Sequence, residues 1–160
     1  MFEHNPDSGL ISDGEIRYVL MRADVLMRLG DYLPVKSSQI FFDALAQTVS
    51  SGASGSFEYY KARGAAGLDA MLEKGAAVAR NLGWGSWQIA TFGDTHVEVL
   101  VSNSPFAAGF GPSQTPVCGA ISGALQAIFR VEGEPNVVVR ETKCAAQGAA
   151  NCHFYVERKP

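Results

Sequence analysis

The stretch "VVVRETKCAAQGAANCHFYV", residues 137–156, decides the fold, because it predicts two strands joined by a loop that contains Gly148. Side chains alternate along a strand, so Val137, Val139 and Glu141 share the apolar face of the first strand. The apolar face of the second strand carries Cys152, Phe154 and Val156. A carboxylate and a cysteine therefore point toward the apolar side of the predicted sheet.

A carboxylate on an apolar face is costly unless a cation or a metal ion pairs with it. Cys144 follows Glu141 by three residues, and a tight turn in the loop would bring it back beside Cys152. Cys118 lies in the first turn of the preceding predicted helix, where the helix dipole favours a thiolate. Three thiolates and one carboxylate can close a tetrahedral shell around zinc.

The alternative is that the three cysteines are reduced, buried small residues and that Glu141 is a solvated residue at a strand end. The spacing lacks the Cys-x-x-Cys signature of an obvious zinc site. His153 would be the conventional fourth ligand, but it alternates away from Cys152. The residues alone leave both interpretations open, and they favour Glu141 as the fourth ligand.

Hydrophobic spacing predicts that the first half of the chain is mainly helical. After a polar tail at residues 1–13, a short strand is expected within residues 15–21 and a helix within residues 23–33. Two further helices are expected at residues 37–51 and 65–83, and Gly52 and Gly55 should interrupt or bend the chain between them.

The second half predicts a sheet. Residues 86–92 and 96–102 flank Gly93-Asp94 as an antiparallel hairpin, and residues 103–114 predict a loop rich in Gly, Pro and Ser. A helix should then begin at Thr115 and end at Gly133. Its small residues would let it lie close to a sheet: Gly119, Ala120, Ser122, Gly123 and Ala124. The predicted fold class is α/β of the α+β type, with N-terminal helices on a mostly antiparallel sheet and a C-terminal helix and strand pair joined by the zinc site.

The chain of 160 residues has the size of one domain, which we place at residues 14–160. Lys and Arg total 13 against 16 for Asp and Glu, and a formal charge of -3 argues against a nucleic-acid partner. The sequence has no apolar run long enough to span a membrane and no secretory signal pattern. We expect a soluble, cytoplasmic protein whose odd number of cysteines does not form a disulfide framework.

Three segments resemble the C-terminal half of the 4-vinyl reductase domain: "SPFAAGFG", "CGAISG" and "VVVRETKCAAQGAANCHFYV". The shared pattern is a Cys, a small-residue helix, Glu-x-x-Cys, a Gly and Cys-x-Phe. In the zinc-containing sensor modules of phenol-responsive bacterial activators, the residues at matching places are the zinc ligands. The resemblance implies an α/β fold, a homodimer, and a structural zinc ion held by Cys118, Glu141, Cys144 and Cys152. The apolar segment at residues 18–21, so near the N-terminus, needs burial somewhere, which also favours a homodimer.

The resemblance also implies a domain that binds a small hydrophobic molecule. We expect an apolar cavity between the helices of residues 38–80 and the sheet, with the predicted loop at residues 103–111 at its mouth. Aromatic residues on a Gly/Pro loop gain little unless they close over a ligand, which favours two of the candidates in particular. The candidate pocket residues are Phe106 and Phe110, which are favoured, and Phe41, Met71 and Trp87. Phenol sensors hold the ligand hydroxyl with a histidine and a tryptophan, and neither has an evident counterpart here.

The competing function is an enzyme. Hydride transfer needs a nicotinamide or a flavin, and the sequence has neither a GxGxxG motif after a strand nor a phosphate loop. Four protein ligands would also close a zinc shell to the water needed for hydrolysis. We therefore predict no catalytic residue and favour a carrier or sensor of a hydrophobic, aromatic or cyclic molecule. The alternatives are an enzyme or accessory factor in tetrapyrrole (bacteriochlorophyll-type) metabolism and an assembly module resembling vesicle-tethering subunits.

Overall fold

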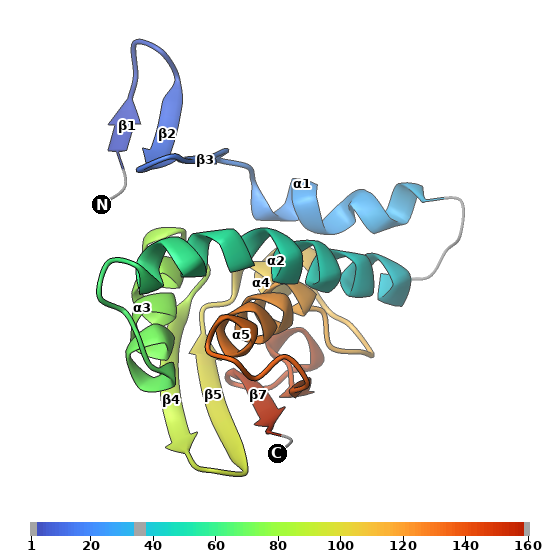
Figure 1. The fold of residues 1–160 in the computed structure, drawn as a ribbon. Coiled ribbons are helices and arrows are strands. Elements are labelled where there is room, and N and C mark those ends of the chain that lie inside the picture. The colour runs from blue at the N-terminus through green and yellow to red at the C-terminus, as the bar shows by residue number, and fades with distance from the viewer. Residues whose placement is uncertain (1–2, 34–37, 159–160) are drawn as a thin grey trace.

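The computed structural model describes residues 3–33 and 38–158, which form two antiparallel sheets and a set of helices (Figure 1). The N-terminal part contains β1 (Glu3–Asn5), β2 (Leu10–Asp13), β3 (Ile16–Tyr18), α1 (Ala23–Met27) and the 3-10 helix η1 (Arg28–Tyr32). The central part contains α2 (Ser38–Lys61), α3 (Leu68–Asn81), β4 (Ser86–Phe92), β5 (His96–Ser102) and α4 (Pro105–Phe110). The C-terminal part contains α5 (Gly119–Val131), β6 (Val138–Lys143), the 3-10 helix η2 (Ala145–Gln147) and β7 (Cys152–Glu157).

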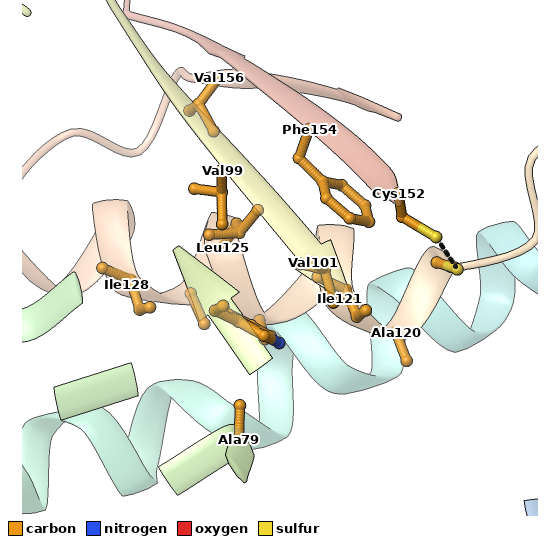
Figure 2. Packing of buried hydrophobic residues seen from close by; sticks show 14 of the residues in the cluster. Ala79, Val99, Val101, Ala120, Ile121, Leu125, Ile128, Cys152, Phe154 and Val156 are labelled. Atoms are coloured by element: carbon orange, nitrogen blue, oxygen red, sulfur yellow. Dashed lines mark hydrogen bonds between the residues drawn. The ribbon is translucent and has the colours of Figure 1, made fainter. Parts of the chain in front are cut away.

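The main sheet has the strand order β4-β5-β7-β6 and is antiparallel throughout. Its inner face is apolar, because the inward-facing residues of β5 and β7 are at most 1% exposed. Helix α5 covers this face with Ile121, Leu125 and Ile128, and Figure 2 shows these side chains opposite Val99 and Phe154. The predicted α+β fold class, the hairpin at Gly93-Asp94 and the alternation over residues 137–141 and 152–156 are confirmed. The zinc site expected to join the final strand pair stays a prediction. The inward-facing residues of the two strands are Val97, Val99, Val101, Cys152, Phe154 and Val156.

Helix α2 crosses α5 at very short range. A Cβ atom on Gly119 would clash with the carbonyl oxygen of Phe42, and one on Gly123 would clash with that of Ala46. Glycine is therefore needed at both positions, because only a residue without a side chain lets the two backbones approach so closely. The small residues of α5 were expected to bring this helix close to a sheet. Instead, both glycines face α2, and the larger apolar residues of α5 face the sheet.

The expected interruption at Gly52 and Gly55 is wrong, because α2 runs without a break from Ser38 to Lys61. An interior glycine costs a helix only about 0.5–1 kcal/mol relative to alanine. The apolar face of α2 buries Phe42 and Phe57 on either side of the two glycines. We infer that this burial outweighs the cost of both glycines.

The predicted loop at residues 103–114 contains a short helix, α4, which sequence analysis missed. The hydroxyl of Ser104 caps it by accepting a hydrogen bond from the backbone N–H of Ala107, and Pro105 occupies its first turn. Gly109 lets α4 lie directly against the backbone of Ala23 in α1. The Gly, Pro and Ser residues of this segment flank a short helix instead of forming one continuous loop.

The predicted start of the next helix at Thr115 is also wrong, since α5 begins at Gly119 with Cys118 as its N-cap. The carbonyl oxygen of Thr115 accepts a hydrogen bond from the Ser113 hydroxyl, which closes a local turn instead of a helical one. A residue before proline also avoids the helical conformation. The predicted end is right, because Gly133 has a φ of 90°.

The N-terminal region has more structure than expected. The predicted polar tail contains β1 and β2 in its described part, and these pair with β3 to make the second sheet. The helix expected at residues 23–33 divides into α1 and η1. The strands and α1 lie on the opposite side of α2 from the main sheet (Figure 1). Within the described residues, no helix combines the length and the hydrophobicity that a membrane span requires.

The helix crossing makes a testable prediction. Gly123→Ala should lower the free energy of unfolding by about 1–3 kcal/mol, because the added methyl group overpacks a tight contact. Gly55→Ala is the matched control, since a Cβ atom there meets nothing within 4 Å. This control should raise the free energy of unfolding by about 0.5–1 kcal/mol. Urea unfolding of both variants checks the pair, and equal stabilities would contradict the close crossing.

Candidate functional site

The three cysteines and Glu141 converge on one point between α5 and the sheet. The Sγ atom of Cys118 lies 3.6 Å from that of Cys152 and 3.9 Å from that of Cys144. Figure 2 marks the shorter of these contacts by a dashed line from Cys152. One potential ligand atom from each of the four residues lies within 4.8 Å of all the others. The predicted four residues are therefore brought together, and the cluster can hold a metal ion.

A β-bulge brings Cys144 into the cluster. Glu141 pairs with Phe154, but two residues later Lys143 pairs with His153, so the strand contains one extra residue. Strict alternation would have placed Cys144 on the outer face with Arg140. The bulge reverses this orientation and directs Cys144 inward. The sequence predicted the proximity of Cys144 and Cys152, but it attributed it to a turn.

Hydrogen bonds and a helix terminus position the remaining candidate ligands. Cys118 is the N-cap residue of α5, and its backbone N–H donates to Oε2 of Glu141 over 2.9 Å. The backbone N–H of Ala145 donates to the Cys152 sulfur over 3.3 Å, and the Ser104 hydroxyl lies 3.2 Å from the Cys118 sulfur. The two backbone N–H donors, at Cys118 and Ala145, stabilise negative charge on the ligand atoms that accept from them.

Glu141 also has an unsatisfied atom. Its Oε1 atom is buried and has no hydrogen-bond partner among the described residues. A buried acceptor without a partner costs about 1–3 kcal/mol, and more when it is charged. A cation within the cluster would remove that cost.

The cluster cannot carry all its negative charges unaided. Burial raises the pKa of Glu141 to about 8, and the neighbouring Cys144 adds to this rise. Hydrogen bonds with Cys118 and Cys152 lower the pKa of Cys144 to about 2, whereas hydrogen bonds with Cys144 and Cys152 raise the pKa of Cys118. All three cysteines are free, and the Cys118 sulfur is much farther from the other two than the roughly 2.05 Å of a disulfide. Metal ligands must lose their protons to bind, so a cation in the cluster would replace the protons that the other groups hold in its absence.

A second candidate site is an apolar cavity of about 240 Å³ between α2, α3, α5 and β4. Small side chains make the space, because α2 and α3 contribute glycine and alanine where larger residues would fill it. Ala79 of α3 is one of these lining residues (Figure 2). The lining residues are Tyr18, Val49, Gly52, Ala53, Ser56, Phe57, Tyr60, Gly75, Val78, Ala79, Leu82, Trp84, Trp87 and Ala124.

This cavity lies between the first helices and the sheet, as the sequence predicted. The predicted pocket residues do not all line it. Trp87 lines the cavity, whereas Phe41, Met71, Phe106 and Phe110 are not among its described lining residues.

The expected mouth at residues 103–111 is wrong, because this segment forms α4 and contributes no lining residue. Phe106 is only 3% exposed and packs edge-on against Trp84, with ring centroids 5.0 Å apart. Phe110 packs in the same way on Phe42, at 5.3 Å. Their role as ligand contacts stays a prediction, and the contacts that they make are those of core residues.

Sequence analysis missed the polar end of the cavity. Three hydroxyl-bearing residues line it: Tyr18 from β3, and Ser56 and Tyr60 from α2. No sequence signal distinguishes these residues from the other serines and tyrosines of the chain. Only the docking of the N-terminal sheet on α2 brings Tyr18 to this wall.

The chain matches one family model and is similar in fold to several solved structures. Residues 97–158 match the family model of the 4-vinyl reductase domain. The phenol-responsive sensory domain of the transcription activator PoxR, solved with phenol, is 20% identical to this chain, with a TM-score of 0.81 over 98% of this chain and 84% of that one. A trafficking protein particle complex subunit 3 from Naegleria fowleri, covalently bound to palmitic acid, is 14% identical, with a TM-score of 0.56 over 86% of this chain and 95% of that one.

A vinyl-4-reductase family protein from Methanocaldococcus jannaschii is 18% identical, with a TM-score of 0.49 over 86% of this chain and 94% of that one. Among curated protein sequences, none matches the chain closely enough to count as a relative. The family match runs from β5 to β7 and includes all four clustered residues, and the shared fold with the PoxR sensory domain extends over nearly the whole chain. The resemblance to the 4-vinyl reductase domain, predicted from the cysteine pattern and its neighbours, is therefore confirmed, with residues 97–158 as the segment that matches the family.

Proposed function

We propose that the protein is a sensor or carrier that binds a small hydrophobic molecule in the cavity between α2 and α3, with zinc in a structural role. The observation that carries this proposal is a cavity walled by Phe57, Trp84 and Trp87 in a fold shared with a phenol-responsive sensory domain. Aromatic walls with a few polar groups are typical of small-molecule sites.

The size of the cavity favours a compact ligand. Drug-sized ligands occupy pockets of roughly 300–1,000 Å³, whereas an apolar cavity of about 150 Å³ holds benzene. At about 240 Å³ the cavity fits a single ring with a short substituent. A thioester-linked ligand does not fit this proposal, because all three cysteines of the chain lie in the metal cluster and none lines the cavity.

Zinc is the metal that best fits the cluster. Three sulfur atoms and one carboxylate oxygen are ligands that zinc accepts in tetrahedral geometry. With Zn–S bonds of about 2.3 Å, two sulfurs in a tetrahedron lie roughly 3.8 Å apart. The sulfur–sulfur separations from Cys118 in the structure are 3.6 and 3.9 Å. Four protein ligands leave no open position for water, which supports a structural role.

Reduced cysteine ligands also support a cytoplasmic location.

We predict one zinc ion per chain. Elemental analysis of protein purified without chelators should find it, and a strong chelator should lower the melting temperature, because structural zinc binding is coupled to folding. Cys152→Ser should lose both the zinc and the response to the chelator. Glu157→Gln is the control on the same strand, since its side chain pairs with Arg140 away from the cluster. A metal-free parent would contradict the site.

The cavity makes a separate prediction. Ala79→Leu places a larger side chain in the cavity and should abolish binding of ethylbenzene, a probe of suitable size. Ala77→Leu is the matched control, because residue 77 lies on the same helix and is exposed. Titration followed by NMR should show one saturable site in the parent and in the control. Equal binding by Ala79→Leu would mean that the cavity is not the ligand site.

We also propose a homodimer. A run of apolar residues follows β3 into α1 and η1, and its side chains are exposed, with Val19 at 80% and Leu20 at 85%. A contiguous apolar surface of this kind marks an interaction site. A second copy is the occupant that we favour, because it would bury two such surfaces against each other. The exposed residues of the run are Val19, Leu20, Met21, Val25, Leu29, Tyr32 and Leu33.

Light scattering at micromolar concentration should give twice the chain mass of 17.1 kDa. Leu20→Glu should shift the mass to that of one chain, because a buried unpaired carboxylate is costly at an interface. Phe92→Glu is the control, since Phe92 is also exposed, at 52%, but lies on β4 of the main sheet. A monomeric parent would refute the dimer.

A further inference from the structure

The Ser104 side chain lies beside the metal cluster without belonging to it. Its hydroxyl oxygen is 3.2 Å from the Sγ atom of Cys118, and the residue is only 3% exposed. A buried hydroxyl group must find its hydrogen-bond partners within the protein, because little water reaches it. Within residues 3–33 and 38–158, these partners are the Cys118 sulfur and the backbone N–H of Ala107.

The direction of these two hydrogen bonds is fixed when a metal ion is bound. The backbone N–H of Ala107 can only donate, so the Ser104 oxygen accepts from it, over 3.4 Å. A cysteine that ligates a metal ion is a thiolate and has no proton to give. The Ser104 hydroxyl must therefore donate to the Cys118 sulfur, and the contact becomes a charge-assisted hydrogen bond.

Ser104 supplies to Cys118 what the backbone supplies to two other candidate ligands. Glu141 accepts from the backbone N–H of Cys118, and the Cys152 sulfur accepts from the backbone N–H of Ala145. Cys118 is the N-cap of α5, but its side chain makes no capping hydrogen bond, so the helix gives its sulfur no donor. The hydroxyl of Ser104 fills that place.

The packing of α4 holds the hydroxyl in position. Ser104 is the N-cap residue of this helix, so its side chain is placed by the helix. Phe106 of α4 packs edge-on against Trp84, and both rings are part of the interior. Gly109 of the same helix lies directly against the backbone of α1. Contacts with two other segments thus anchor the helix that presents Ser104 to the sulfur.

We propose that Ser104 is a positioning residue of the metal site, whose hydroxyl donates to the Cys118 thiolate, orients that sulfur and slows the loss of the metal. This role rests on the metal site of the proposed function. Outer partners of this kind tune a metal site, and removing one costs about 10- to 100-fold in metal affinity. Ser104→Ala should therefore weaken zinc binding by about 10- to 100-fold in competition with a chromophoric chelator.

Cobalt(II) gives a readout that a purely structural role of Ser104 would not change. It occupies tetrahedral sulfur sites and absorbs light there, whereas zinc has a filled d shell. A hydrogen bond lowers the energy of a sulfur lone pair, so its loss should shift the sulfur-to-cobalt charge-transfer band to longer wavelength. Absorption spectra of the full chain, prepared with cobalt in place of zinc, should show this shift in Ser104→Ala.

Three further variants separate the hydrogen bond from the capping of α4. Ser104→Thr keeps a hydroxyl group and should restore the parental affinity and spectrum. Ser104→Gly removes the hydroxyl but leaves a residue that is accepted at an N-cap, so it should show the same shift even if Ser104→Ala impairs the helix. Ser113→Ala is the matched control, because the Ser113 hydroxyl donates to the carbonyl oxygen of Thr115 and not to a cluster atom. This control should keep the parental affinity and spectrum.

Two results would overturn the role of Ser104. One is a parental charge-transfer band in both Ser104→Ala and Ser104→Gly, and the other is a zinc affinity within about twofold of the parental value in both. Either result would leave the metal site standing as long as the parent binds cobalt. If the parent binds neither zinc nor cobalt, the metal site and the role of Ser104 fail together.

Discussion

The hydrogen bond from the Cys118 backbone to Glu141 is the contact on which the C-terminal half depends. It joins the start of α5 to β6, so the helix that covers the sheet is fixed to one of its edge strands. The same two residues belong to the cluster, together with cysteines on both sides of the η2 turn. A metal ion in that cluster would hold a helix, a strand and a loop at one point, which is where a small domain gains most from a cross-link.

The close crossing of α2 and α5 has a consequence for the cavity. Glycines at 119 and 123 let the two helices touch along their backbones, and the next turns of α2 then line the cavity with Gly52, Ala53 and Ser56. Interiors are normally packed so well that a missing side chain leaves a costly void. Small residues on α2 and α3 therefore maintain a space that a fold selected only for stability would fill.

The N-terminal sheet contributes to this space through polar contacts. Asp13 of that sheet accepts a hydrogen bond from the Tyr60 hydroxyl of α2, and Tyr18 of the same sheet lines the cavity together with Tyr60. Hydrogen-bonded groups with little exposure are specific in geometry, because a displaced partner leaves a buried polar atom unsatisfied. A ligand in the cavity and the position of the N-terminal sheet are thus linked by the same side chains.

The sequence by itself determined the main sheet, most of the helices and the four clustered residues, because strand alternation and ligand chemistry are local properties. It could not show the bulge before Cys144, since an extra residue in a strand is defined only by the partner strand. It could not show the packing of Phe106 or the unbroken course of α2 for a related reason: the neighbours of these residues come from distant segments, Trp84 for the phenylalanine and α5 for the helix around its glycines. The cavity also arises only in the tertiary structure, because β3, α2 and α3 meet there across about 60 residues of chain.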